Sequence, residues 1–144
     1  MNAYADTSFV VPLYRAETTS AAASKAMTRL QAPVWLSPLC ELELHNAFHL
    51  SVFRGEIDPA AAIRKTQLFA DDVAIRIFTI QPVPHSTLYP KAIELAARHS
   101  AILGTRSLDL MHVAAALILN ADLFLSFDES QKKAAEAEGL KVEP

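Results

Sequence analysis

The stretch DLFLSFD occupies residues 122–128, and its first six residues form the most hydrophobic strand candidate in the chain. A short helix is expected soon after it, over residues 131–138, because Gly139 suits the left-handed position that follows a helix. Asp128 stands between the strand and this helix. A strand followed directly by a helix is the unit from which parallel sheets are built. The same unit is therefore expected elsewhere in the chain.

The same alternation of strand and helix recurs along the whole sequence. Short apolar or β-branched runs bounded by proline or polar residues predict further strands at residues 2–5, 33–37, 76–80 and 140–142. Alanine-rich composition or apolar residues at helical spacing predict helices at residues 18–30, 39–55, 58–73, 86–99 and 108–119. By default we expect these helices to turn their periodic apolar residues inward, including Leu42, Leu50, Phe53, Ile63, Leu68 and Ile93. The apolar residues at positions 39–53 and 63–73 are the alternative candidates for a partner surface. The pattern predicts one α/β domain over residues 1–144, a three-layer α/β/α fold with a central parallel sheet of four to five strands.

The composition is typical of a compact globular domain. The chain has 144 residues, of which 51% are hydrophobic and 20% charged, and this excludes a disordered protein. Its one cysteine, Cys40, excludes an internal disulfide and is interpreted as a small core residue. The chain starts without a secretory signal, and its apolar runs are far shorter than the ~20 residues of a membrane helix. We expect a cytoplasmic protein with no membrane partner.

Three acidic residues stand where an α/β fold places its chemistry. Asp6 ends the first predicted strand, Asp128 follows the strand at residues 122–127, and Asp109 lies in the first turn of a predicted helix. Each has an ordinary structural explanation, as a turn residue, a helix cap or a charge that complements the helix dipole. Together, two carboxylates about 4 Å apart would repel by roughly 4 kcal/mol at an effective dielectric of ~20. A divalent cation relieves that repulsion, and Mg²⁺, with Mn²⁺ as the alternative, prefers such oxygen ligands.

Four segments, taken in order, resemble the PIN domain family, and within it the VapC-type toxins of bacterial toxin–antitoxin pairs. They are ADTSFVVPLY, LSPLCELELHNAF, GTRSLDLMHVAAAL and LFLSFDESQKKAAEAEGL, and they span essentially the whole chain. The resemblance implies a PIN-like fold and a Mg²⁺-dependent endoribonuclease that cuts tRNA, rRNA or mRNA and leaves a 5′-phosphate and a 3′-hydroxyl. It also implies a cognate antitoxin, a homodimer and growth arrest. The net charge of −3 neither supports nor excludes RNA, because the acidic cluster contributes to it.

By this resemblance, the family's four acidic metal-binding positions fall on Asp6, Glu43, Asp109 and Asp128. Glu41 is the alternative to Glu43, and the two lie about 200° apart on a helix, so they cannot both face one pocket. The spacing from Ser37 and the following Leu44 favour Glu43. Many family members carry a further Asp shortly after the last position, where this chain has Gln131. A second metal ion would then bind weakly.

Several neighbours of the acidic residues are candidates for orienting them. The hydroxyls of Thr7, Ser8 and Ser126 and the amide of Asn46 stand close in sequence to the candidate ligands, although capping and turn bonds explain the hydroxyls equally well. His112 stands one turn after Asp109, which would allow it to lie near the metal site, but a histidine at the edge of the core is the preferred interpretation.

His45 and His49 share a helix face at the spacing of a zinc motif, but no glutamate follows His45. A surface or partner-facing pair is the preferred interpretation of these two histidines.

Three other functions compete with the ribonuclease. A phosphotransferase with Asp6 as its nucleophile would carry a second Asp two residues later, where Ser8 stands. A receiver-like signalling module would need paired acidic residues at its start and a lysine at a late strand end, and the sequence has neither in place. A non-catalytic PIN fold that only binds RNA or a partner would not need acids at all four positions.

Overall fold

The fold is built on a five-stranded sheet in which every strand runs parallel to its neighbours. The computed structural model describes residues 1–31 and 33–144. The strands are short and follow the order β3-β2-β1-β4-β5 across the sheet. Their bounds are β1 Ala3–Ala5, β2 Val34–Leu36, β3 Phe78–Ile80, β4 Leu123–Leu125 and β5 Lys141–Glu143. All five expected strands are present in the described residues; the first four are shorter than expected, and the last lies one residue later than expected.

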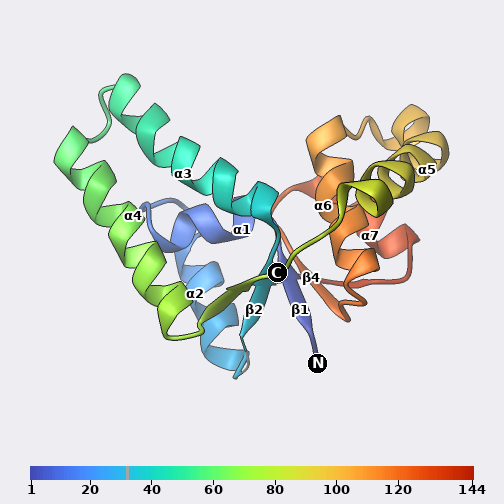
Figure 1. The fold of residues 1–144 in the computed structure, drawn as a ribbon, viewed down its shortest axis with the longest axis horizontal. Helices are drawn as coiled ribbons and strands as arrows, with labels where there is room; N and C mark the ends of the chain where they lie inside the picture. Colours follow the sequence, from blue (N-terminus) through green and yellow to red (C-terminus); the bar gives the residue numbers. More distant parts are fainter. Residues whose placement is uncertain (32) are drawn as a thin grey trace.

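Helices cover both faces of this sheet, as Figure 1 shows with the sheet seen nearly on edge. One face carries α1 Thr7–Val10, the 3₁₀ turn η1 Val11–Leu13, α2 Ser20–Arg29, α3 Pro38–Phe53 and α4 Pro59–Ala74. The other face carries α5 His85–Leu103, α6 Ser107–Ile118 and α7 Glu129–Ala137. The predicted three-layer α/β/α architecture is confirmed.

The central strands are buried on both sides, and this explains why β4 is so hydrophobic. In β4, Leu123 and Leu125 belong to the core beneath α1–α4, whereas Phe124 belongs to the core beneath α5–α7. In β1, Tyr4 likewise faces the second core and stacks on Phe124, with ring centroids 5.8 Å apart. Side chains on a strand alternate between faces, so a strand covered on both faces needs apolar residues throughout.

The packing face of α3 differs from the expectation. The helix is buried through Cys40, Leu44, Phe48 and Ser51, which follow one another at helical spacing. The expected inward residues Leu42 and Phe53 are instead 66% and 87% exposed, and Leu50 is also exposed. The prediction was wrong here because apolar residues lie on every side of this helix, so periodicity alone does not select the face that packs.

The same error affects α4 and α5. Ile63 and Leu68 of α4 and Ile93 of α5 were expected to point inward, but each is more than half exposed. Helix α4 packs through Ala62 and Phe69, and α5 packs through Leu88, Ala92 and Leu95.

Two helix termini also differ from the prediction. Helix α5 runs one turn beyond the expected end and stops at Gly104, whose φ of 66° is left-handed. At the start of α1, where the hydroxyls of Thr7 and Ser8 were candidates for capping, the cap is instead Asp6, whose side chain accepts from the backbone N–H of Phe9.

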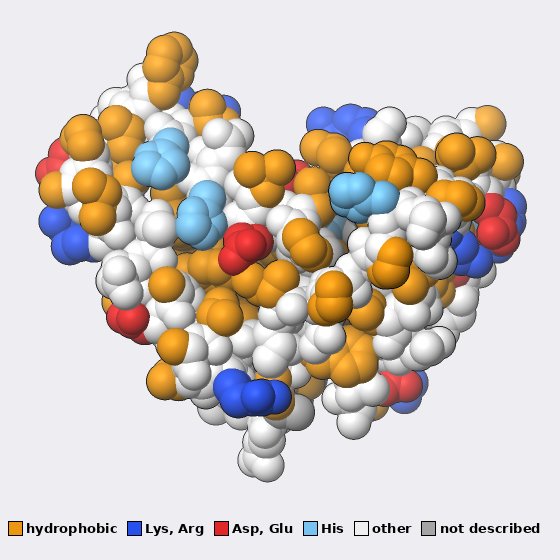
Figure 2. Space-filling view, viewed as in Figure 1, with side chains coloured by type: hydrophobic (Ala, Val, Ile, Leu, Met, Phe, Trp, Pro, Cys, Tyr) orange, Lys and Arg blue, Asp and Glu red, His pale blue; other side chains and the backbone are white. Residues whose placement is uncertain are grey.

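Many of the exposed apolar side chains lie on two lobes of the molecule. Figure 2 shows a notch at one edge, with orange side chains on the α3–α4 lobe and on the α5–α6 lobe. Within residues 1–31 and 33–144, none of the helices has the length and apolar character needed to cross a membrane.

Candidate functional site

The four candidate carboxylates come from four segments that meet at the carboxyl-terminal edge of the sheet. Asp6 directly follows β1, and Asp128 follows β4, which pairs with β1. Glu43 lies in the second turn of α3 and Asp109 in the first turn of α6. In open parallel sheets, binding sites form at this edge because the strands all end there.

Asp6 is fully buried and takes all its contacts from protein donors. Its Oδ1 accepts from Ser8 Oγ at 2.8 Å and from the backbone N–H of Phe9 at 3.1 Å. Its Oδ2 accepts from Ser126 Oγ at 2.7 Å. Burial raises the pKa of Asp6 above its ordinary value, and the charge of His112 and these hydrogen bonds offset the effect only in part. The carboxylate is thus held in one orientation at an electrostatic cost.

Ser126 connects Asp6 with Asp128. The backbone N–H of Asp128 donates to Ser126 Oγ at 2.9 Å, and the Asp128 side chain caps α7 by accepting from the backbone N–H of Gln131 at 2.9 Å. Ser8 supports the same turn, since the backbone N–H of Phe127 donates to its Oγ at 2.9 Å. Ser8 and Ser126 therefore hold the two strand-end acids in a fixed relation.

Asp109 is held between Arg106 and Gln131. Its Oδ2 accepts from the backbone N–H of Arg106 at 3.0 Å and lies 3.5 Å from the guanidinium Nε of the same residue. Its Oδ1 accepts from Gln131 Nε2 at 3.1 Å. The other atom of this amide, Gln131 Oε1, is buried and has no hydrogen-bond partner among the residues that the structure describes.

Glu43 belongs to a second group of contacts on α3. Its Oε1 accepts from Thr7 Oγ1 at 2.8 Å and lies 2.5 Å from His112 Nε2. Burial tends to raise the pKa of Glu43, but the hydrogen bond and charge of His112, together with Thr7, outweigh it and lower the pKa below its ordinary value. Among the described side chains, neither Glu41 nor the exposed Asn46 takes part in these contacts.

Three residues of the site were not predicted as members of it from the sequence: His112, Tyr4 and Ser37. His112 is buried and touches Glu43, so it is more than a histidine at the core edge. Behind it, Tyr4 Oη lies 2.8 Å from His112 Nδ1 and donates to Ser37 Oγ at 2.9 Å. The spacing of His112, one turn after Asp109, was the available signal. Tyr4 and Ser37 carried none, because an aromatic residue in a strand and a serine before a helix are ordinary.

The donor atoms of this region suit a divalent cation in chemical kind. Carboxylate, hydroxyl and amide oxygens are the ligands that Mg²⁺ prefers, and the unpartnered Gln131 Oε1 adds a buried acceptor next to Asp109. In the described part of the chain, however, no three His, Cys, Asp or Glu side chains come close enough together to hold a metal ion. The carboxylates are turned toward protein donors and not toward a common point.

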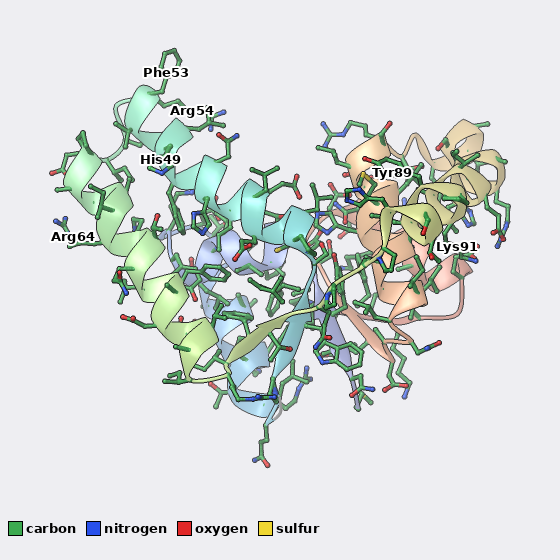
Figure 3. The ribbon with its side chains drawn as sticks, in the orientation of Figure 1. His49, Phe53, Arg54, Arg64, Tyr89 and Lys91 are labelled. Carbon is green, nitrogen blue, oxygen red and sulfur yellow. The ribbon has the colours of Figure 1, made fainter. Side chains whose placement is uncertain are left out.

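His45 and His49 do not form a zinc site with a third such ligand in the described residues. His45 packs edge-on against Phe69, with ring centroids 6.0 Å apart and an interplanar angle of 87°. His49 lies exposed toward the outer end of α3, as Figure 3 shows.

The sequence matches the PIN domain family over residues 3–137, so the chain belongs to that family. Its fold is similar to that of VapC20 of Mycobacterium tuberculosis, a toxin that cleaves the sarcin–ricin loop. The two chains are 18% identical with a TM-score of 0.71, and the match covers 99% of this chain and 100% of that one.

Two further structures share the fold. FitAcB of Neisseria gonorrhoeae is 15% identical with a TM-score of 0.67, and the match covers 98% of this chain and 96% of that one. VapBC-1 of nontypeable Haemophilus influenzae is 16% identical with a TM-score of 0.66, and the match covers 99% of this chain and 97% of that one. No curated protein matches the sequence.

Proposed function

We propose that this PIN-domain protein is a metal-dependent endoribonuclease that acts in the cytoplasm as the toxin of a toxin–antitoxin pair. The observation that carries the proposal is the convergence of Asp6, Glu43, Asp109 and Asp128 on one edge of the sheet. Two of them, Asp6 and Asp109, are buried there, and burying a carboxylate costs free energy unless it is paired or binds a metal ion. The substrate would be tRNA, rRNA or mRNA.

Asp6, Asp109 and Asp128 would hold Mg²⁺ or Mn²⁺, with Glu43 on the facing helix. When bound, such an ion lowers the pKa of a coordinated water and stabilises charge on the attacked phosphorus and the leaving oxygen. The protein's own part is to orient these oxygens. Ser8 and Ser126 hold Asp6, and Gln131 holds Asp109. Arg106, which is 81% exposed beside Asp109, is placed to attract an RNA phosphate.

The phosphotransferase alternative would carry a second aspartate two residues after Asp6. Ser8 stands there instead and donates to Asp6 Oδ1 at 2.8 Å. A phosphate-trapping assay separates this alternative from the ribonuclease.

One observation favours a second candidate, a PIN fold that binds RNA or a partner without cleaving. The candidate carboxylates are directed at protein donors, and the described residues hold no ready group of three metal ligands. Calorimetric titration with Mg²⁺ separates the two candidates, because only the nuclease requires the ion to bind.

The ribonuclease is tested by comparing the unmodified protein with Asp6→Asn and Asp109→Asn in Mg²⁺. We expect both substitutions to abolish cleavage of a labelled RNA, and EDTA to abolish it in the unmodified protein. Cleavage by either variant at the original rate would rule out the acidic site as the catalyst. Lys91, on the far helix α5, offers a control: Lys91→Gln should cleave normally.

The toxin role is tested in growing bacteria. Expression of the chain alone should arrest growth, and co-expression of the small neighbouring gene should relieve the arrest. Harmless accumulation of folded protein would count against a toxin. The Asp6→Asn variant should be harmless while still binding the antitoxin.

The antitoxin is proposed to bind the apolar outer surface of the α3–α4 lobe. Groups of large, exposed apolar side chains on adjacent helices are typical of protein interfaces. On this lobe the exposed apolar side chains are Leu42, Leu50, Phe53, Ile63 and Leu68. Figure 3 shows Phe53 at the outer end of α3, directed away from the rest of the molecule. A Phe53→Asp variant should lose antitoxin binding in a pull-down and retain RNA cleavage. We further expect a homodimer, which light scattering would detect.

A further inference from the structure

A continuous chain of buried polar side chains connects the interior of the fold to Glu43. Tyr4 Oη donates to Ser37 Oγ at 2.9 Å and lies 2.8 Å from His112 Nδ1, and His112 Nε2 lies 2.5 Å from Glu43 Oε1. Ser37, Tyr4 and His112 are all at most 3% exposed. The contacts join β1, the residue before α3, and α6, although Tyr4 and His112 are 108 positions apart in the sequence.

The position of the Tyr4 hydroxyl is not required for packing. Its ring stacks on Phe124 within the core beneath α5–α7, and a phenylalanine ring would fill the same space. A buried hydroxyl and a buried imidazole lose their hydration, and their mutual hydrogen bonds return little net stability. A fully connected buried network does, however, fix the orientation of its members.

The network acts on one specific oxygen of Glu43. Both ring nitrogens of His112 have a partner, so the imidazole cannot rotate without breaking a hydrogen bond. Thr7 Oγ1 donates to the same oxygen, Oε1, at 2.8 Å. Within the described part of the chain, Oε2 accepts no protein donor. Glu43 is therefore held by one oxygen, and the other is left for a ligand.

We propose that Tyr4 and His112 are positioning residues that lock Oε1 of Glu43 and so leave Oε2 available to a divalent ion at the nuclease site. This inference rests on the proposed ribonuclease and assigns to it two residues beyond the acidic set. It predicts that the hydroxyl of Tyr4, which touches neither ion nor RNA, influences the reaction only through Glu43.

The test is a double-mutant cycle of Tyr4→Phe and Glu43→Gln, read by single-turnover cleavage of RNA. Outer contacts of this kind typically contribute 10- to 100-fold, so we expect Tyr4→Phe to lower the cleavage rate by about that factor at unchanged KM for RNA. In the Glu43→Gln background the same substitution should change nothing further. If the two substitutions lower the cleavage rate independently, so that their factors multiply in the double variant, the proposal is overturned.

Tyr14→Phe is the matched control, because its hydroxyl donates to Asp72 at the α4 side of the core, away from the site. It should alter the melting temperature but not the cleavage rate. His112→Gln, which keeps an N–H donor, should retain more activity than His112→Leu. Equal activities of these two variants would contradict a positioning role.

A readout without RNA separates this inference from the proposed function. In nitrogen-15 NMR of the metal-free protein, the imidazole N–H of His112 should be protected from exchange and lose that protection in Tyr4→Phe. Calorimetry with Mn²⁺ alone should show weaker binding by Tyr4→Phe than by Tyr14→Phe. If the unmodified protein cleaves no RNA, the proposed function fails, and these two measurements still decide the positioning role. Unchanged protection and unchanged Mn²⁺ affinity would overturn it.

Discussion

Gln131 Nε2 donates a hydrogen bond of 3.1 Å to Asp109 Oδ1, and so places a neutral amide where the resemblance to the PIN family implies a further aspartate. The same residue donates its backbone N–H to Asp128 at 2.9 Å. One glutamine thus links the acids of α6 and α7. This linkage keeps both carboxylates in place without adding a negative charge.

Replacing this amide with a carboxylate should make the site depend on its cation. We expect Gln131→Glu to be less stable than the unmodified protein in EDTA, because two carboxylates about 4 Å apart repel by up to roughly 4 kcal/mol at an effective dielectric of ~20. Mg²⁺ should raise the melting temperature of the variant more than that of the unmodified protein. Thermal unfolding with and without Mg²⁺ measures both effects, and equal melting temperatures in EDTA would contradict the prediction.

The buried carboxyl of Asp6 should destabilise the metal-free protein at neutral pH. Burial raises its pKa in the folded state above that of the unfolded chain. Its stabilising contribution is then fully present only below the unfolded pKa and is lost as the pH rises through the folded pKa. We expect Asp6→Asn to be the more stable protein at pH 7 in EDTA, with the difference shrinking as the pH falls toward the ordinary range of an aspartate. Urea unfolding across this range gives the free energies, and a difference that grows toward acid pH would refute the assignment.

The RNA cleavage rates of two variants decide whether Glu43 or Glu41 is the second acidic residue of the site. Glu43 touches Thr7 and His112, whereas Glu41 lies two residues earlier on another side of α3. We expect Glu43→Gln to lower the RNA cleavage rate by at least the 10-fold typical of a lost site contact, and Glu41→Gln to leave it unchanged. The opposite ranking would reassign the second acidic position.

Cys40 should be chemically silent in the folded protein. It has no exposed surface, and burial strongly raises the pKa of its thiol, so the reactive thiolate is scarce. A colour reagent for thiols should detect one group in urea and none under native conditions. Rapid labelling of the native protein would mean that α3 separates readily from the sheet.

Two phenylalanines on α3 should have opposite effects on stability. Phe48 is 1% exposed and Phe53 is 87% exposed. Phe48→Ala is expected to lower the free energy of unfolding by about 3–5 kcal/mol, the usual loss for a buried aromatic ring. Phe53→Ala should change it by no more than about 0.5 kcal/mol. Urea denaturation of both variants tests the packing face of the helix.

Local patterns in the sequence were sufficient to predict the three-layer α/β/α architecture. The apolar run at β4 and Gly139, which follows the last helix, are local signals, and the structure follows them closely. The packing face of α3 was not predictable in this way. Leu42, Leu44 and Phe48 are similarly apolar, and only contact with the sheet and with α4 selects among them.

The site was predictable where its residues end a strand and unpredictable where they meet across the fold. Asp6 and Asp128 follow apolar strands, so their edge of the sheet could be inferred. The contact of Tyr4 with His112 joins residues that are far apart in the chain, and no local pattern announces it. In the sequence, Gln131 was notable only because the resemblance to the PIN family implies an aspartate there. Its contact with the site is shown by its hydrogen bond to Asp109.

The order of strands in the sheet has a consequence for how the protein is made. Strand β4 pairs directly with β1 at the centre of the sheet, yet it follows β1, β2 and β3 in the chain. A nascent chain that still lacks residues 123–128 has neither this partner for β1 nor the Ser126 hydroxyl that holds Asp6. The site therefore cannot assemble during synthesis until residues 123–128 have been added and have joined β1.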